Sequence, residues 1–290
     1  MKILVTGSSG LISHYLVNEL LENNHQVIGI DNSSKYGKIE KYFDQHHNFK
    51  FIDGDVKNTE LLYELLKDCD QIVAMAAKIG GIGYFHRYAY DLISENEKIT
   101  CSTFDAAIKA FKINKLQKIN VISSSMVFEN STTFPHSEGD QFHSKPPLST
   151  YGFQKLATEY FAKGAWEQYG LPYTIIRPFN CVGIGEQKAL NDKNIESGNI
   201  KLAMSHVVPD LIQKILKGQK PLRILGDGSQ IRHFTFGGDL AIGIRLCIEN
   251  KKSYNEDFNI SNDESTSIIS LAKLIWEKIY PDEEFKYITE

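Results

Sequence analysis

The sequence has little of what marks a disulfide-stabilised or metal-binding protein. Its 290 residues include four cysteines, and none of these forms a CxxC pair. Such cysteine usage is typical of reduced structural thiols in the cytosol rather than of a disulfide framework or a thiolate metal site. We therefore predict a cytoplasmic location and no metal site. The four residues are Cys69, Cys101, Cys181 and Cys247.

The chain also lacks a long apolar run and an excess of positive charge. No stretch approaches the roughly 20 apolar residues that a membrane-spanning helix needs. The start, MKILVTGSSG, passes directly into a strand pattern, without the apolar core and cleavage site of a signal peptide. With 32 Lys and Arg against 36 Asp and Glu, the formal net charge is −4. Neither nucleic acid nor a membrane is therefore expected as a partner.

What the chain does have is a globular composition and a regular alternation of elements. Hydrophobic residues make up 42% and charged residues 23% of the sequence. The length suffices for one large domain or for two closely joined ones. Apolar runs predict strands, and apolar residues at helical spacing predict helices. Strands are expected at 3–6, 27–30, 49–53, 71–74, 118–123 and 173–177, and helices at 11–22, 60–66, 96–111, 150–169 and 208–216.

This alternation predicts an α/β fold, namely a Rossmann-type doubly wound parallel sheet with helices on both faces. The alternation lasts to about residue 180 and then breaks. We therefore expect residues 1–180 to form a Rossmann domain, to which residues 231–250 return. Residues 181–290 are expected to form a smaller α/β lobe for the substrate.

The first turn, VTGSSGLIS, has the context of a dinucleotide-binding turn. Gly7 and Gly10 follow a strand and open a helix, so the backbone can approach a pyrophosphate near N–H groups at the helix start. The position of the third glycine holds Ser13, which leaves the fingerprint incomplete. A tight turn without a ligand explains the two glycines as well.

Acidic residues at strand ends strengthen the dinucleotide interpretation. Asp31 ends the second strand about twenty residues after the glycine turn, where a carboxylate accepts hydrogen bonds from the adenosine ribose. No arginine stands next to it in DNSSK, which favours NAD over NADP. Asp55 can reach the adenine amino group, and Lys78 can reach the cofactor phosphates. A turn role suits Asn32, and a solvated role suits Lys78 equally well.

Candidate catalytic residues lie in the middle of the chain. Tyr151 and Lys155 stand four positions apart in STYGFQKLATEYF, on one face of an expected helix. A fixed ammonium favours the phenolate, so we predict that Lys155, with a positive nicotinamide ring, lowers the pKa of Tyr151 toward neutrality. Three serines in NVISSSMVF close a strand, where a hydroxyl can share charge on the reacting oxygen. Each feature alone also fits a solvated helix face or a strand cap.

In this order, the motifs resemble an extended short-chain dehydrogenase/reductase of the NAD-dependent nucleotide-sugar epimerase/dehydratase family. The resemblance runs from Met1 to about Trp276, through TGSSGLI, DN, DGDV, AMAAK, SSSMVF, YGFQK, RPFN and LGDGSQIRHF. It implies that Ser124 is the catalytic serine and that Tyr151 is the base. It also implies that Lys155 holds the ribose and lowers the pKa of the tyrosine.

The same resemblance implies ligand contacts. Asn180 and Arg232 are expected on the substrate diphosphate, where a guanidinium suits phosphate oxygens. Ser125, Met126 and His206 are expected at the substrate. Residues 1–180 accordingly bind NAD and residues 181–290 bind a nucleotide sugar. Cofactor contacts are expected from Gly7, Gly10, Leu11, Ile12, Asp31, Asn32, Asp55, Val56, Ala74, Ala76, Lys78, Tyr151, Lys155 and Pro178.

The residues after Ser124 separate the reactions of the family. Dehydratases carry an acidic pair there, whereas this chain has Ser125 and Met126, so 4,6-dehydration is not expected. The stretches AAKIGG and SHVVP resemble the GDP-fucose synthase subgroup, which places a cysteine at Met126 and an acid histidine at His206. Half of that pair is present, and a binding or packing role explains His206 as well.

We therefore predict an NAD-dependent epimerase that transfers a hydride at C4 of a nucleotide sugar through a 4-keto intermediate. A nucleotide-sugar 4-dehydrogenase or 4-ketoreductase, or a GDP-sugar epimerase or reductase, needs the same residues and stays open. A protein that only binds the cofactor is disfavoured, because Ser124, Tyr151 and Lys155 are intact. The nucleotide is UDP or GDP. Helices 96–111 and 151–169 have apolar residues on more than one face, which predicts a homodimer.

Overall fold

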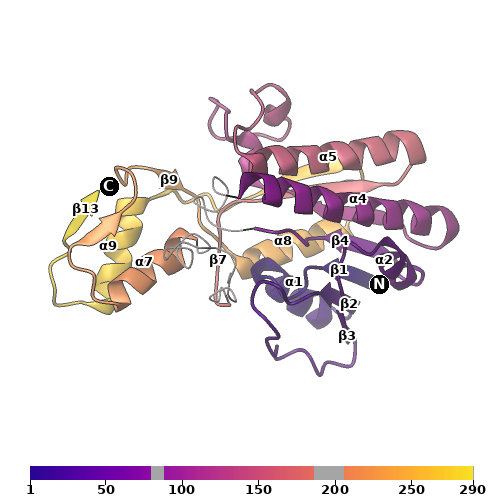
Figure 1. The fold of residues 1–290 in the computed structure, drawn as a ribbon, viewed down its shortest axis with the longest axis horizontal. Coiled ribbons are helices and arrows are strands. Elements are labelled where there is room, and N and C mark those ends of the chain that lie inside the picture. Colours follow the sequence, from indigo (N-terminus) through magenta and orange to yellow (C-terminus); the bar gives the residue numbers. More distant parts are fainter. Residues whose placement is uncertain (80–87, 186–205, 290) are drawn as a thin grey trace.

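The computed structural model describes residues 1–79, 88–185 and 206–289, which form a sheet-based body and a smaller lobe (Figure 1). The body holds a seven-stranded sheet in the order β11-β6-β5-β4-β1-β2-β3, and every pair in it is parallel. The strands are β1 (Lys2–Thr6), β2 (Gln26–Asp31), β3 (Phe49–Asp53), β4 (Gln71–Ala74), β5 (Lys118–Ile122), β6 (Tyr173–Pro178) and β11 (Glu256–Ile260).

The order of the first six strands is that of a Rossmann fold. The chain runs from β1 outward to β3, then crosses back to β4 and continues to β6 on the other side. The strand order therefore reverses between β1 and β4, and ligands of such sheets bind at the carboxyl ends of the strands beside this point.

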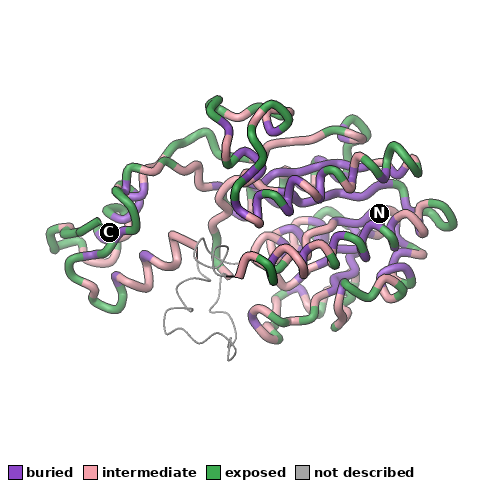
Figure 2. The backbone as a smooth tube through the Cα atoms, turned by 45° about the horizontal axis from the view of Figure 1, so that its top comes forward, coloured by how far each residue is buried: buried purple, intermediate pink, exposed green. Residues whose placement is uncertain are grey.

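Helices cover both faces of this sheet. On one face α1 (Leu11–Glu22) packs against α8 (Gly237–Glu249); on the other, α4 (Ala89–Ile113) lies between α2 (Thr59–Leu66) and α5 (Thr150–Tyr169). Figure 2 shows that buried residues gather in the strands and on the helix sides that face them. Neighbouring residues of β1 point to opposite cores, as the pleat requires. Each fully buried aliphatic side chain contributes about 1.5–3 kcal/mol.

The structure confirms the predicted fold class and several element bounds. The helices expected at 11–22 and 150–169 have those limits. The strand β11 was not predicted, because its sequence, EDFNI, carries two acidic residues and an asparagine around a single aromatic ring. It pairs with β6 at the edge of the sheet. The body therefore takes a strand from beyond the range 231–250.

The second lobe has its own core. It consists of α7 (Val207–Leu216), β8 (Leu222–Ile224), α9 (Ile268–Ile279) and β13 (Tyr287–Thr289), packed around the buried ring of Trp276. Two short ladders lie in the chain segments that join the lobe to the body. They pair β7 (Cys181–Val182) with β10 (Thr235–Phe236) and β9 (Ile231–Arg232) with β12 (Thr266–Ser267).

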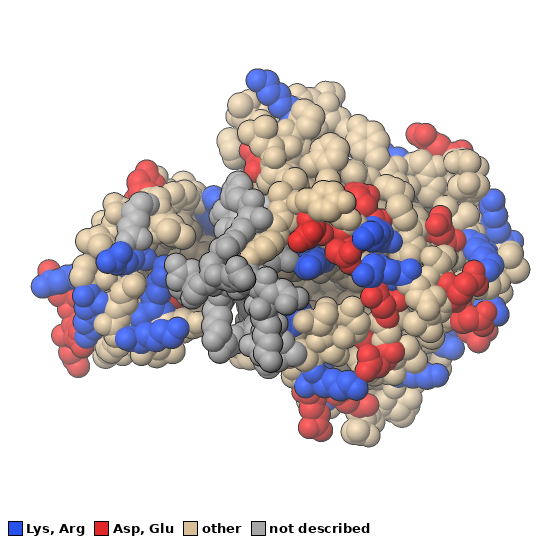
Figure 3. Space-filling model, in the orientation of Figure 1, with Lys and Arg blue, Asp and Glu red and all other residues tan. Residues whose placement is uncertain are grey.

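The surface charges do not divide between the two parts. On the face shown in Figure 3, positive and negative side chains are interspersed over both the body and the lobe. In the segments 1–79, 88–185 and 206–289, no helix is both long and apolar enough to cross a membrane.

Candidate active site

The glycine turn lies where β1 ends and α1 begins, at the carboxyl edge of the sheet. Gly7 has a φ of +67°, and its N–H donates to the carbonyl oxygen of Ile30 at 2.8 Å. A Cβ on Gly7 would lie 2.8 Å from the Cα of Ala76, just beyond β4, so only glycine permits this close approach. Thr6 supports the same contact, because its Oγ1 accepts from the N–H groups of Met75 and Ala76 at 3.0 and 3.1 Å.

The first turn of α1 suits an anionic ligand. Gly10 is the N-cap residue, it makes no side-chain cap, and the turn after it contains no acidic residue. N–H groups that no side chain caps, together with the helix dipole, favour a pyrophosphate at this end. Ser13, at the place of the third glycine, is buried, and its Oγ lies 3.7 Å from the sulfur of Met75. The serine is thus accommodated at the helix–sheet contact.

Asp31 is held directly beside the glycine turn. Its Oδ2 accepts from the backbone N–H of Ser9 at 3.0 Å, and its Oδ1 accepts from that of Ser33 at 2.7 Å. The carboxylate is therefore fixed at the edge where the predicted ribose contact requires it. Asn32 forms a turn of its own, in which its Oδ1 accepts from the N–H of Ser34 at 3.1 Å.

Of the other predicted cofactor residues outside α5, Leu11 and Ile12 begin α1 and Pro178 ends β6, and the rest lie near the ends of β3 and β4. Asp55 accepts from the backbone N–H of Lys57 at 2.9 Å, and Val56 is buried. The backbone of Lys78 exchanges two hydrogen bonds with the side chain of Asn96 on α4, at 2.6 and 2.9 Å, while its own side chain is exposed. The structure thus places these residues at one edge, and their contacts with a cofactor stay predictions.

Ser124, Tyr151 and Lys155 meet at the carboxyl end of β5. The side chains of Ser124 and Tyr151 share a hydrogen bond. The Nζ of Lys155 donates to the carbonyl oxygen of Ile122, the last residue of β5, at 2.8 Å. The three residues that the motifs singled out therefore form one constellation at the edge where Rossmann folds bind ligands.

The start of α5 explains how Tyr151 reaches this point. Ser149 caps the helix, and its Oγ accepts from the N–H of Gly152 at 3.0 Å. A Cβ on Gly152 would lie 2.7 Å from the carbonyl oxygen of Met126, within the short 3-10 helix Ser125–Phe128. Glycine after the tyrosine therefore lets the first turn of α5 pack closely against the segment that follows Ser124.

The predicted lowering of the Tyr151 pKa is not found in the protein chain alone. Burial raises the pKa of Tyr151 to about 12, and the hydrogen bond with Ser124 opposes this without reversing it. Burial also lowers the pKa of Lys155 to about 8, while the charge of Glu159 opposes that shift. The physical reason is that both groups are buried, and the loss of solvation outweighs the Ser124 hydrogen bond at Tyr151 and the Glu159 charge at Lys155. The nicotinamide ring is the other positive charge that the prediction invoked.

Of the predicted substrate residues, Ser125 and Met126 follow Ser124 in the body, and the other three lie toward the lobe. The chain leaves β6 at Pro178 and reaches Asn180, which has a φ of +36° and donates from Nδ2 to the carbonyl oxygen of His233 at 3.3 Å. Arg232 directly precedes His233, at the end of β9. The structure therefore brings Asn180 next to the strand that carries Arg232. His206 is the N-cap residue of α7, inside the lobe.

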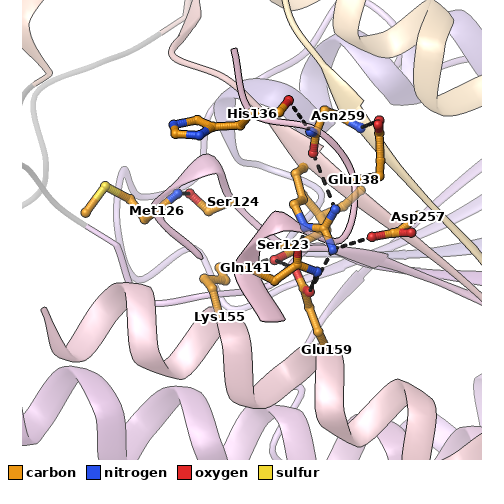
Figure 4. A network of polar contacts seen from close by, with 12 residues as sticks. Ser123, Ser124, Met126, His136, Glu138, Gln141, Lys155, Glu159, Asp257 and Asn259 are labelled. Carbon is orange, nitrogen blue, oxygen red and sulfur yellow. Dashed lines mark hydrogen bonds and ion pairs between the residues drawn. The ribbon is translucent and has the colours of Figure 1, made fainter. Parts of the chain in front are cut away.

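A buried ionic group at the site was missed by the sequence analysis. Glu159, one turn after Lys155, forms an ion pair with Arg177 at 2.7 Å, and neither side chain is exposed (Figure 4). The arginine within the apolar strand YTIIRP was a usable indication, because charged residues are almost never fully buried without a partner.

A dinucleotide turn beside a buried tyrosine that hydrogen-bonds a serine defines a class of enzyme. Such enzymes move a hydride and a proton at an alcohol carbon, with a nicotinamide cofactor. The sequence profile of the NAD dependent epimerase/dehydratase family matches residues 3–261, and the chain belongs to this family. The predicted family and NAD as the cofactor are thereby confirmed.

Several of the relatives of the chain come from archaea and bacteria. A putative UDP-glucose 4-epimerase from Methanocaldococcus jannaschii is 28% identical over 278 residues, which are 96% of this chain and 82% of the relative. A UDP-N-acetylglucosamine 4-epimerase from Methanobrevibacter ruminantium, solved with UDP-N-acetylmuramic acid, has a TM-score of 0.82 and 29% identity. The match covers all of this chain and 85% of that one.

A third similar protein was solved with a nucleotide sugar and NAD bound together. The UDP-glucuronic acid 4-epimerase from Bacillus cereus, in complex with UDP-glucuronic acid and NAD, has a TM-score of 0.80 and 28% identity. The match covers all of this chain and 86% of that one. At this level of identity the likeness extends to the whole described fold, including the lobe.

Proposed function

We propose that this protein is an NAD-dependent epimerase that inverts C4 of a UDP-linked sugar through a 4-keto intermediate. The observation that carries the proposal is the hydrogen-bonded pair of Ser124 and Tyr151 at the carboxyl end of β5, with Lys155 one turn along the same helix. The relatives that are named as UDP-sugar 4-epimerases support the position of the reaction on the sugar.

In this proposal the side chains of the site handle the proton of the C4 hydroxyl. Tyr151, as the phenolate, accepts that proton, and Ser124 donates a hydrogen bond to the oxygen as its charge changes. Lys155 holds the cofactor ribose and stabilises the phenolate by its charge. Bound NAD would supply the acceptor of the C4 hydride and the source of the returning hydride. After the 4-keto sugar has turned over, Tyr151 gives its proton back to the oxygen.

The residues beside Ser124 favour simple inversion over dehydration. Ser125 and Met126 carry no carboxyl group, and Met126 packs against the small buried cluster that contains Tyr151. A thioether neither donates nor accepts a proton in this chemistry, so neither residue can remove a proton from C5. Asn180 and Arg232 are proposed to bind the diphosphate, and His206 to bind the sugar or its nucleotide.

UDP is the proposed nucleotide, because the relatives named for their substrates use UDP-sugars, except for the dTDP-glucose dehydratases. The decisive experiment incubates the protein with UDP-, GDP-, CDP- and dTDP-sugars and follows the products by NMR and reduced nicotinamide by absorbance. A C4-inverted sugar without net NADH is the expected result. A keto sugar with NADH would instead show a 4-dehydrogenase. Tyr151→Phe serves as the control, and turnover at the wild-type rate in this variant would refute the assigned base.

A homodimer in the cytoplasm completes the proposal. The outer side of α5 carries a shallow apolar groove lined by Phe153, Leu156, Ala157, Tyr160 and Phe161. Phe153 and Tyr160 are 48% and 58% exposed as whole residues, which fits coverage by a second copy. Light scattering at micromolar concentration tests this, and a monomer would contradict it. The buried thiols of Cys69 and Cys247, both free, fit a reducing compartment.

A further inference from the structure

A polar network lies directly behind Ser124 and Lys155, where an apolar core is usual (Figure 4). Its centre is the ion pair between Glu159 on α5 and Arg177 on β6, both with side chains that are 0% exposed. We call this pair, with its hydrogen-bonding partners Ser123, Gln141, Asp257 and Asn259, the Glu159 network. Burying such charges is costly unless each is paired and hydrogen-bonded, so the arrangement requires an explanation.

Both oxygens of the Glu159 carboxylate are fully used. Oε1 accepts from the Oγ of Ser123 at 2.6 Å and from the Nε of Arg177 at 2.7 Å. Oε2 accepts from the Nη2 of Arg177 at 2.8 Å and from the Nε2 of Gln141 at 3.2 Å. The same Nη2 of Arg177 also donates to the Oδ2 of Asp257, on β11, at 2.6 Å. One carboxylate therefore ties α5 to β5, β6 and the loop before the helix.

The inner members of the network adjoin residues assigned to the site. Residues that are adjacent in the chain move together. A shift of the Glu159 carboxylate would therefore displace the ends of β5 and β6 and the turn of α5 that carries Lys155. The pairs are Ser123 beside Ser124, Arg177 beside Pro178, and Glu159 one helical turn from Lys155 on the same face.

We propose that Glu159 is a positioning residue of the active site. Its carboxylate, clamped by Arg177, fixes the strand end that carries Ser124 and the helix turn that carries Lys155. It also supplies the negative charge that keeps the Lys155 ammonium in a buried position. Asp257 holds the far side of Arg177 and has no such contact with the catalytic residues.

Four charged side chains, in the order Lys155, Glu159, Arg177 and Asp257, alternate in sign from the site outward. Lys155 and Arg177 are the cations, and Glu159 and Asp257 are the anions. Burial lowers the pKa of Lys155, and the charge of Glu159 opposes it. Burial would also lower the pKa of Arg177, but hydrogen bonds and charges of Glu159 and Asp257 outweigh it and raise that pKa. Without Glu159, the Lys155 ammonium would lose its nearby counter-charge.

Within residues 1–79, 88–185 and 206–289, few other charged groups face Lys155. On α5 the titratable neighbours are Tyr151 and Glu159. On α4, Glu97 hydrogen-bonds to Gln154 and does not act on Lys155. The small cavity beside Lys155 is lined from β1, β4 and α4 by uncharged residues, namely Thr6, Ala74, Ala76, Ala77, Asn96, Ile99, Thr100, Thr103 and Phe104. Removal of the Glu159 charge is therefore expected to act on Lys155 without compensation.

The test compares Glu159→Gln with Asp257→Asn, two exchanges of a carboxylate for an amide on opposite sides of Arg177. Isothermal titration measures NAD affinity from pH 6 to 10, and thermal unfolding measures stability. In the wild type, NAD affinity should fall as pH rises through the Lys155 pKa of about 8. In Glu159→Gln the midpoint should fall by about one pH unit, the effect of an adjacent opposite charge. Asp257→Asn should lose stability but keep the wild-type midpoint.

Turnover gives a second readout, which rests on the proposed function. In Glu159→Gln we expect kcat for the UDP-sugar to drop about 10- to 100-fold, as small misplacements of catalytic groups do, with KM nearly unchanged. Asp257→Asn should keep kcat. Equal losses of kcat in both variants, with the same pH midpoint as the wild type, would show a merely structural ion pair and overturn the proposal.

Two further points keep the test decisive. If Glu159→Gln does not fold, Ser123→Ala removes only one hydrogen bond of the carboxylate; a wild-type kcat in that variant would overturn the proposal. If the wild type epimerises no UDP-sugar, the proposed function fails, while the NAD titrations, which need no substrate, still decide the role of Glu159.

Discussion

The two ends of β5 each hold a buried lysine, and they differ in what surrounds it. At the first residue of the strand, the side chain of Lys118 is 0% exposed, and burial lowers its pKa to about 8. At the last residue, the Nζ of Lys155 donates to the carbonyl of Ile122, and burial lowers the pKa of Lys155 to about 8 as well. By burial and pKa alone, the two ammonium groups are indistinguishable.

Their neighbours separate them. Lys118 donates to the carbonyl oxygen of Cys247, in the last turn of α8, at 2.8 Å and to the Oγ of Ser253 at 2.9 Å. These acceptors are neutral, and a helix end with exposed carbonyl dipoles stabilises a cation. Lys155 instead has a carboxylate one turn away and the phenol of Tyr151 on the same face. A perturbed pKa therefore marks both lysines, and only the partners indicate which one does chemistry.

The largest expected difference between the two lysines is in the rate of turnover after substitution. Lys155→Met removes the ammonium that we propose holds the cofactor ribose and stabilises the phenolate. The rate should fall about 10²- to 10⁴-fold, the usual weight of an acid–base group. Lys118→Met should retain the wild-type rate. Steady-state kinetics on the same sugar checks both, and a matching loss in the two variants would remove the distinction drawn here.

The next effect concerns stability against pH. Between the folded pKa of Lys118, about 8, and its ordinary value of 10.5, the unfolded chain holds a proton that the folded protein has lost. The contribution of Lys118 to stability should therefore rise with pH across this window, and below it this group adds no slope. Lys118→Met should show a smaller rise in its unfolding midpoint between pH 8 and 10. An unchanged slope would mean that Lys118 is not desolvated.

The smallest expected effect comes from Ser253→Ala. The variant removes one acceptor of the Lys118 ammonium and one donor to the carbonyl of Cys247. Stability should fall by about 0.5–1.5 kcal/mol, the net value of an ordinary hydrogen bond, while kcat stays constant. Chemical denaturation measures the first and kinetics the second. A change in kcat would indicate that the amino end of β5 communicates with the site.

Much of the body could be predicted because local sequence signals mark where its helices and strands begin and end. The helix 150–169 begins after a serine that caps it and ends before Gly170, which has a φ of +73°. The strand β11 could not be predicted in the same way, since EDFNI has no apolar run. It forms because β6 offers an unfilled edge and because Arg177 attracts Asp257.

The residues of the candidate site could be predicted from the sequence, but the pKa shifts and ion pairs among them could not. The motifs named Ser124, Tyr151 and Lys155, and the fold brings them together. The direction of the Tyr151 pKa shift depends on burial, which spacing in a sequence does not reveal. The role of Glu159 depends on three elements that meet only in the folded chain.

The late position of β11 also bears on how the protein emerges during synthesis. Asp257 follows Arg177 by 80 residues. At translation rates of about 5–20 residues per second, the arginine precedes its outer partner by roughly 4–16 seconds. During that time the nascent sheet ends at β6, with an open edge that other strands can pair with. A ribosome that stops before residue 256 therefore releases a chain that carries Ser124, Tyr151 and Lys155 but neither the last strand of the sheet nor the outer counter-charge, Asp257, of its buried arginine.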